Sequence, residues 1–186
     1  MIKLQPKKGQ LLIAEPSLLG DIFFNRSVIL LTEQNEKGTI GFILNKPTNY
    51  NINDLIPDIN ANFIVYNGGP VEQENLFIIH NIPQIISSSI AITSELYWGG
   101  DFELIKTLIN KGKISKENIR FFLGYSGWSL NQLETEIQES AWAISKNYLL
   151  KDIFTKTSST LWREKIIELG GDYILFSNSP ENPVLN

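Results

Sequence analysis

Short apolar runs separated by polar turns mark the first part of the chain, a pattern typical of β-strands. Segment 11–14 is wholly apolar, which predicts a short buried strand. Segments 27–32 and 39–44 are rich in Ile, Val and Leu, and the polar turn between them ends at Gly38. This arrangement predicts a β-hairpin.

Further strands are expected in the middle of the chain. Segments 62–71 and 74–83 each carry an apolar run, and they flank a Gly-Gly-Pro loop at 68–70. This spacing predicts a second pair of strands around the loop. Segment 89–94 predicts another short strand.

The second half of the chain adds the 3.6-residue periodicity of helices. Segment 101–112 predicts a helix that Asp101 caps and Gly112 ends, because its apolar residues fall on one face. Segments 129–140 and 159–171 predict two more helices. In the last one, we expect three apolar residues to point inward: Leu161, Ile166 and Leu169.

Strands are also expected at 118–124 and 141–147, and the tail 177–186 is polar with two prolines, which indicates irregular structure. Hairpins come first and helices mix with strands later. This order favours an α+β fold with a mixed, largely antiparallel sheet. The length of 186 residues fits a single domain, 1–186.

Composition excludes several chemistries. The chain has no cysteine and one histidine, which excludes disulfides, thiolate catalysis and His-rich or Cys-rich metal sites, and we expect no cofactor. The net charge of −4 argues against direct binding to nucleic acid. No apolar run approaches the ~18 residues of a membrane span. We therefore expect a cytoplasmic protein without a membrane segment.

The run Gly124-Tyr125-Ser126-Gly127-Trp128 is the strongest candidate for chemistry. It resembles the G-x-S-x-G turn that exposes a nucleophilic serine between a strand and a helix. The second glycine, however, comes one position too early. A hydrolase that pairs Ser126 with His80 is therefore an alternative hypothesis, since triads occur in other orders.

A structural interpretation explains more of the same run. Ser129 and Gln132 fit a capping box at the start of the helix. Gln132, Glu136 and Glu139 then form an acidic outer face, expected to be solvated. The inner face is an apolar stripe of Leu130, Leu133 and Ile137.

The sequence "GYSGWSLNQLETEI", together with "FFNRSVILL", "GFILNKP" and "YNGGPV", resembles the AlgH/YqgE family of small bacterial proteins over nearly the whole chain. Two positions depart from the family pattern: Gln34 stands where many members carry His, and Ser126 where many carry Ala. The second departure argues against a nucleophilic role for Ser126.

The resemblance implies a bifurcated mixed sheet folded as a pseudo-barrel with flanking helices. It implies no established activity. Some members carry the name of transcriptional regulator through a genetic link to alginate production. A regulator that contacts DNA directly is thus a further alternative, although the chain shows no helix-turn-helix pattern.

Three other motifs offer binding groups at strand ends. Arg26 could hold a carboxylate or phosphate, or pair with Asp21. Asn45 could form an Asx turn or contact a ligand. The amides of Gly68 and Gly69 could form an anion nest or a plain turn.

We expect a non-enzymatic binding or regulatory protein whose partner is a small ligand or another protein, because these motifs fall at strand ends and turns. The expected binding residues are Arg26, Asn45, Gly69, Tyr125, Trp128 and Gln132.

Overall fold

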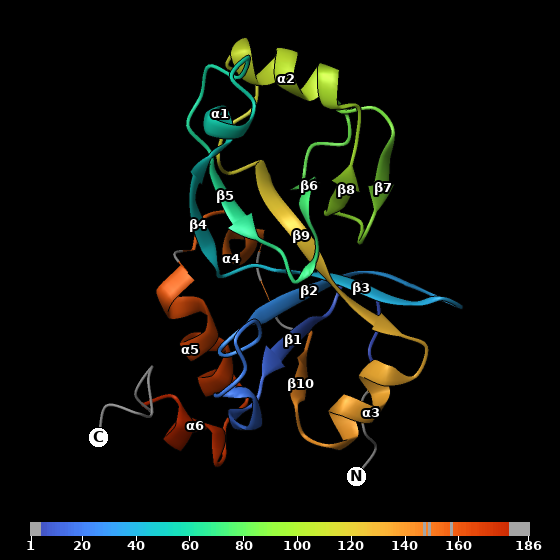
Figure 1. Cartoon of the computed structure of the whole chain (residues 1–186), viewed down its shortest axis with the longest axis vertical. Coiled ribbons are helices and arrows are strands. Elements are labelled where there is room, and N and C mark those ends of the chain that lie inside the picture. Colours follow the sequence, from blue (N-terminus) through green and yellow to red (C-terminus); the bar gives the residue numbers. More distant parts are fainter. Residues whose placement is uncertain (1–4, 147, 149, 157, 179–186) are drawn as a thin grey trace.

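A computed structural model describes residues 5–146, 148, 150–156 and 158–178. Its strands join in one curled sheet that forms a half-barrel with flanking helices (Figure 1). The strands are β1 (Leu11–Ala14), β2 (Val28–Asn35), β3 (Gly38–Ile43), β4 (Pro47–Asn51), β5 (Ile64–Asn67), β6 (Val71–His80), β7 (Ser89–Ala91), β8 (Tyr97–Gly99), β9 (Ile119–Ser129) and β10 (Trp142–Ser145).

The order of the main sheet is β10-β1-β2-β3-β9-β6-β8-β7, with β4 and β5 on a side branch. Within the described part of the chain, β5 and β9 run parallel and every other strand pair is antiparallel. The mixed, largely antiparallel sheet predicted from the sequence is confirmed.

Strand β9 is where the sheet divides. Its C-terminal half pairs with β3, with Gly41 opposite Ser126, whereas its N-terminal half pairs with β5. Both partners lie along the same edge, because Gly68 donates its N–H to Leu123 O in β9 and accepts from the N–H of Ile43 at the end of β3. Strand β6 occupies the other edge. The bifurcation implied by the family resemblance therefore arises at one strand.

Two glycines allow the loop after β5 to lie against β9 where the sheet divides. A Cβ at Gly68 would lie 2.2 Å from Gly124 O, and one at Gly69 would lie 2.3 Å from the backbone C and O of Tyr125. No side chain fits at these separations, so the loop after β5 can lie against β9 only with glycine at both positions.

Two hydrophobic cores lie along this sheet. The larger one gathers β1, β2, β3 and β10 around Phe42 and Trp142, and the smaller one gathers residues such as Phe121 and Ile105. Figure 1 shows β9 running diagonally from the half with α1 and α2 into the half with α3, α5 and α6. Phe121 and Phe122, which are adjacent in β9, belong to different cores because neighbouring side chains of a strand point to opposite faces.

The helices flank the sheet. They are the 3₁₀ turn η1 (Pro16–Leu18) and α1 (Ile52–Leu55), α2 (Phe102–Asn110), α3 (Gln132–Gln138), α4 (Leu150–Phe154), α5 (Ser158–Glu168) and α6 (Tyr173–Phe176). The Asp101 side chain caps α2 by accepting the N–H of Leu104 at 3.1 Å, as predicted. Among the described residues, no helix combines the length and the apolar character that crossing a membrane requires.

Several predicted elements are confirmed: the strand at 11–14, the β2–β3 hairpin, β7, β10, α2 and the helix α5. Leu161 and Ile166 in α5 are buried, and Leu169, directly after it, is half-buried. The strands on either side of the Gly-Gly-Pro loop also exist. Their pairing with each other was wrong, because β5 and β6 both pair with β9 instead.

The segment after 118 differs more. The predicted strand 118–124 continues through the glycines to Ser129, so the expected strand-to-helix turn at Gly124–Trp128 is wrong. Helix α3 starts at Gln132 and not at Ser129, and Leu130 is 60% exposed, outside the expected apolar stripe. Strands β4 and β8 and helices α1, α4 and α6 were not predicted. Of the predicted tail, residues 179–186 lie outside the described part.

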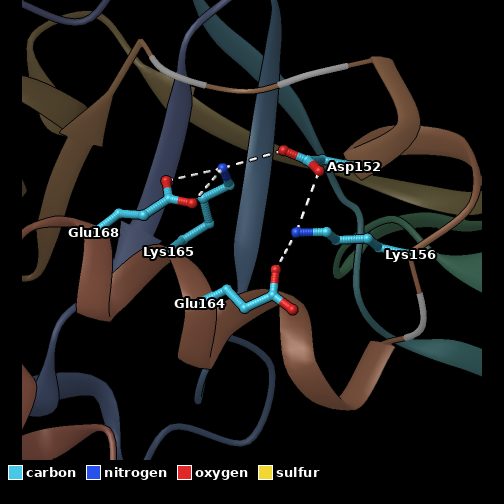
Figure 2. A network of polar contacts seen from close by, with 5 residues as sticks. All are labelled: Asp152, Lys156, Glu164, Lys165 and Glu168. Atoms are coloured by element: carbon cyan, nitrogen blue, oxygen red, sulfur yellow. Dashed lines mark hydrogen bonds and ion pairs between the residues drawn. The ribbon is translucent and has the colours of Figure 1, made fainter.

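An ion network joins α4 to α5 (Figure 2). Lys165 Nζ lies 3.2 Å from Asp152 and 2.9 Å from Glu168, and Lys156 bridges Asp152 and Glu164. Asp152 and Lys165 are both buried, at 3% and 2% exposure. Because each buried charge needs its partner, the pair fixes the position of α4 on α5.

Candidate functional site

A hollow of about 360 Å³ opens where the β2–β3 hairpin meets the end of β9. This volume lies within the range of roughly 300–1,000 Å³ that small-molecule sites occupy. It is lined by Glu33, Asn35, Lys37, Gly38, Thr39 and Ile40 from the hairpin, by Val71, and by Tyr125, Gly127, Trp128 and Ser129 from β9.

The alternation of β9 creates this surface. Ser126 and Trp128 point inward and are buried, whereas Tyr125, Gly127 and Ser129 face outward. Gly127 has no side chain between its two outward neighbours, so the strand surface stays open there. A Cβ at Gly127 would lie 3.3 Å from the Tyr125 ring. The "GYSGW" run therefore makes a strand with a gap in its outer row of side chains.

Tyr125 forms one wall of the hollow. Its ring meets Phe77 edge-on, with 5.6 Å between the ring centroids. Partial burial raises the pKa of the Tyr125 hydroxyl above its usual value, and the nearby Glu72 carboxylate adds to the increase. The hydroxyl therefore keeps its proton at neutral pH and can donate a hydrogen bond.

Trp128 also contributes to the lining of the hollow, but its ring points to the inner face of β9 and the residue is 5% exposed. Trp128 was expected among the binding residues, and the structure shows its side chain buried. Its indole Nε1–H donates to Glu136 Oε2 at 2.9 Å, and the indole of Trp142 donates to the same oxygen at 2.8 Å. Glu136 is half-buried, so the expectation that it belongs to a solvated acidic face is also wrong.

Gln132 extends this network to the rim. Its Oε1 accepts from the backbone N–H and the hydroxyl of Ser129, both at 3.0 Å, and its Nε2 donates to Glu136 Oε1 at 2.9 Å. The predicted capping box is half right: the glutamine side chain reaches back to Ser129, but the Ser129 hydroxyl donates to that side chain and does not cap the Gln132 backbone. Helix α3 is thereby fastened to β9 beside the hollow.

The other three expected binding residues lie away from this hollow's lining. Asn45 Oδ1 accepts the N–H of Val28 at 2.9 Å, and its Nδ2 donates to Arg26 O at 2.8 Å, so its amide joins two backbone segments. The Arg26 guanidinium lies over the Trp162 ring, 5.0 Å from its centroid. Gly69 donates its N–H to Asn67 Oδ1 at 3.0 Å. The amide of Gly68 also bonds internally, so the alternative of an anion nest is wrong.

The structure does not bring Ser126 and His80 together. His80 pairs with Ile119 in the β6–β9 ladder, and Ser126 lies seven residues further along β9, about 23 Å along an extended strand. The Ser126 hydroxyl is fully buried and donates to Gly68 O at 3.0 Å. The geometry therefore removes the basis for a Ser126–His80 hydrolase.

His80 has its own closed environment. Its Nδ1 accepts the N–H of Ile82, so its Nε2–H faces the Ser89 hydroxyl at 2.8 Å, which in turn donates to Ile86 O. Burial lowers the pKa of His80 to about 4, so the ring is neutral near pH 7. This is a structural histidine.

Nothing in the sequence indicated that the hairpin residues would line a binding site. The sequence around Glu33, Asn35 and Lys37 is typical of a polar hairpin turn. Only the pairing of Thr39 with Trp128 shows that this turn lies beside the end of β9. No group of three or more His, Asp or Glu side chains suited to a metal ion occurs in the described ranges.

Comparison with known proteins gives consistent matches. A family model described as AlgH-like matches residues 11–174. A UPF0301 protein of Cytophaga hutchinsonii is 44% identical, covering 96% of this chain and 98% of its own length. A UPF0301 protein of Chlorobaculum tepidum is 38% identical, covering 97% and 96%.

Solved structures agree on the fold. The crystal structure of a Corynebacterium diphtheriae protein superposes with a TM-score of 0.77 at 25% identity, over 96% of this chain and 95% of the other. The solution structure of the AlgH protein from Pseudomonas aeruginosa superposes with a TM-score of 0.72 at 25% identity, over 97% and 98%.

Proposed function

We propose that this chain, which belongs to the AlgH-like family, is a non-enzymatic binding protein. We assign its site to the hollow between the β2–β3 hairpin and β9. Tyr125 and Trp128 line this site and Gln132 supports it. Arg26, Asn45 and Gly69 hold the backbone that positions the strands around it.

The observation that supports this proposal is the hollow itself, because hydrogen bonds hold the strand end that lines it. The indole of Trp128 and the side chain of Gln132 both bond to Glu136, so the end of β9 that lines the hollow is fixed before a ligand arrives. A preformed site loses less conformational entropy on binding than a mobile one. Glu33 and Lys37 place both charge signs at the rim beside the apolar wall of Ile40 and Val71. We therefore expect an occupant with an apolar body and polar ends, either a small molecule or a peptide side chain of a protein partner.

We place this activity in the cytoplasm, where the absence of cysteine fits a chain that needs no disulfide. A regulatory effect on transcription would then pass through the ligand or the partner. The net charge of −4 supports an indirect route over direct contact with DNA.

A thermal-shift screen with small molecules and peptides tests the proposal. A ligand at ~100 times its Kd adds about 2.7 kcal/mol, or roughly 5–10 °C for a chain of this size. We expect hits to be lost in Tyr125→Ala and kept in Tyr50→Ala, since Tyr50 is 52% exposed and outside the hollow. Hits that survive in a folded Tyr125→Ala variant would refute this placement.

A further inference from the structure

A second hollow, of about 400 Å³, lies on a different part of the molecule. Three segments that are far apart in the sequence form it: residues 7–10 before β1, residues 93–96 between β7 and β8, and Lys146, Tyr148 and Leu150 after β10. It shares no lining residue with the hollow beside β9, so a role for this second hollow does not depend on the proposed function.

Specific contacts join these segments. The Tyr148 hydroxyl donates to Gly9 O at 2.7 Å, and Lys8 Nζ donates to Ala91 O at 2.9 Å. Thr93 Oγ1 accepts two backbone N–H groups, those of Glu95 and Leu96, which fixes the turn before β8. Gly9 has φ +83° and its position leaves no room for a side chain, because a Cβ there would lie 2.7 Å from Thr93. These contacts fix the segments relative to one another, so the hollow between them has a defined shape.

The charge around this hollow is opposite in sign to that of the whole chain. Lys7, Lys8 and Lys146 line it together with one acid, Glu95, whereas the chain carries a net charge of −4. Three ammonium groups around one concave surface repel each other, and one carboxylate offsets a single charge. An anion with two or more charges would neutralise the remainder, and a concave surface concentrates such ions.

From this geometry and charge we propose that the hollow is a binding site for a small soluble molecule that carries a phosphate or diphosphate group. Each lysine offers up to three N–H donors, which suits the several acceptor oxygens of a phosphate better than the two of a carboxylate. Ser94, whose hydroxyl is a further donor, lines the hollow with the lysines. A polynucleotide needs a long basic track, and this site is one hollow on an acidic protein.

Calorimetric titration with inorganic pyrophosphate, at constant ionic strength, tests this site. We expect Lys146→Gln to weaken binding about tenfold, the effect of losing one charge-assisted contact, and Lys7→Gln/Lys146→Gln to abolish it. Lys113→Gln is the matched control, since Lys113 is exposed and outside the hollow, and it should bind like the wild type. A thermal melt of each variant without ligand confirms folding.

A second experiment measures binding of the protein to anionic vesicles that contain phosphatidylserine. Binding to pyrophosphate but not to vesicles, with loss in Lys146→Gln, supports a soluble phosphate compound. The proposal is overturned if pyrophosphate produces no saturable heat at millimolar concentration, if all variants bind it equally, or if the protein binds the vesicles alone.

Discussion

Trp128 and Trp142 donate their indole N–H groups to the same atom, Oε2 of Glu136, at 2.9 and 2.8 Å. The two rings meet edge-on with 5.9 Å between their centroids. One carboxylate therefore connects the end of β9, helix α3 and strand β10. Both indoles are buried, so Glu136 is the acceptor that makes their burial tolerable.

Glu136→Ala should destabilise the protein by about 2–4 kcal/mol, because two buried N–H donors lose their acceptor. Glu136→Gln should cost less, since its amide oxygen still accepts, though more weakly than a carboxylate. Urea unfolding followed by tryptophan fluorescence measures both. Glu139→Ala is the control directly after the same helix, because Glu139 is exposed. A loss in Glu136→Ala no larger than in Glu139→Ala would contradict the role of the shared oxygen.

Gly68→Ala should be among the most damaging small substitutions in the chain. Its Cβ would lie 2.2 Å from Gly124 O and 2.9 Å from the Phe42 ring, so β5 would have to move away from β9. Such overpacking typically costs about 1–3 kcal/mol or more. Gly20→Ala offers a matched comparison, since a Cβ there meets nothing within 4 Å. Thermal melts of the two variants should differ by several degrees. Equal melting temperatures would mean that the contact between the Gly68 loop and β9 tolerates a side chain.

Local signals explain what the sequence could predict. Asp101 caps α2 through an atom three residues away, and the hairpin turn before Gly38 lies between its own strands. These features depend on neighbours along the chain, so patterns in the sequence contain them. Helix α2 and the β2–β3 hairpin were predicted for this reason.

Contacts between distant residues explain what was missed. Gly124 resembles a turn residue, but its role is set by Gly69 O, which would lie 2.6 Å from a Cβ there. Trp128 was expected to bind a partner, whereas its indole N–H is used internally by Glu136. Strand β4 is mostly polar because it lies at the edge of the side branch. None of these partners can be identified from spacing alone.

His80 should make the protein less stable in mild acid. Burial lowers the pKa of His80 from 6.5 to about 4 in the folded protein. Between pH 4 and pH 6.5 the unfolded chain therefore binds a proton at His80 that the folded protein does not. The free energy of unfolding therefore rises with pH across this interval, and it falls as the pH drops from 6.5 towards 4. The full effect is at most about 3 kcal/mol.

Urea midpoints of the wild type and His80→Gln, measured from pH 7 to pH 4, isolate this effect from the titration of carboxylates. We expect the wild type to lose more stability than the variant over this range. Parallel pH profiles would show that the folded protein accommodates a charged His80.

The buried pair of Asp152 and Lys165 should behave differently when one partner or both are replaced. Lys165→Met leaves a carboxylate that is 3% exposed without its nearest cation, which typically costs about 3–5 kcal/mol. Lys156 remains 3.3 Å from Asp152, so the loss should fall at the lower end of that range. Adding Asp152→Leu removes the stranded charge, and the double variant should recover most of the stability because no buried charge remains to be desolvated.

Urea unfolding of the two single variants and the double variant forms a thermodynamic cycle whose coupling energy measures the pair. A double variant as unstable as the sum of the two single variants would show that the charges act independently and that packing, not the ion pair, holds α4 against α5.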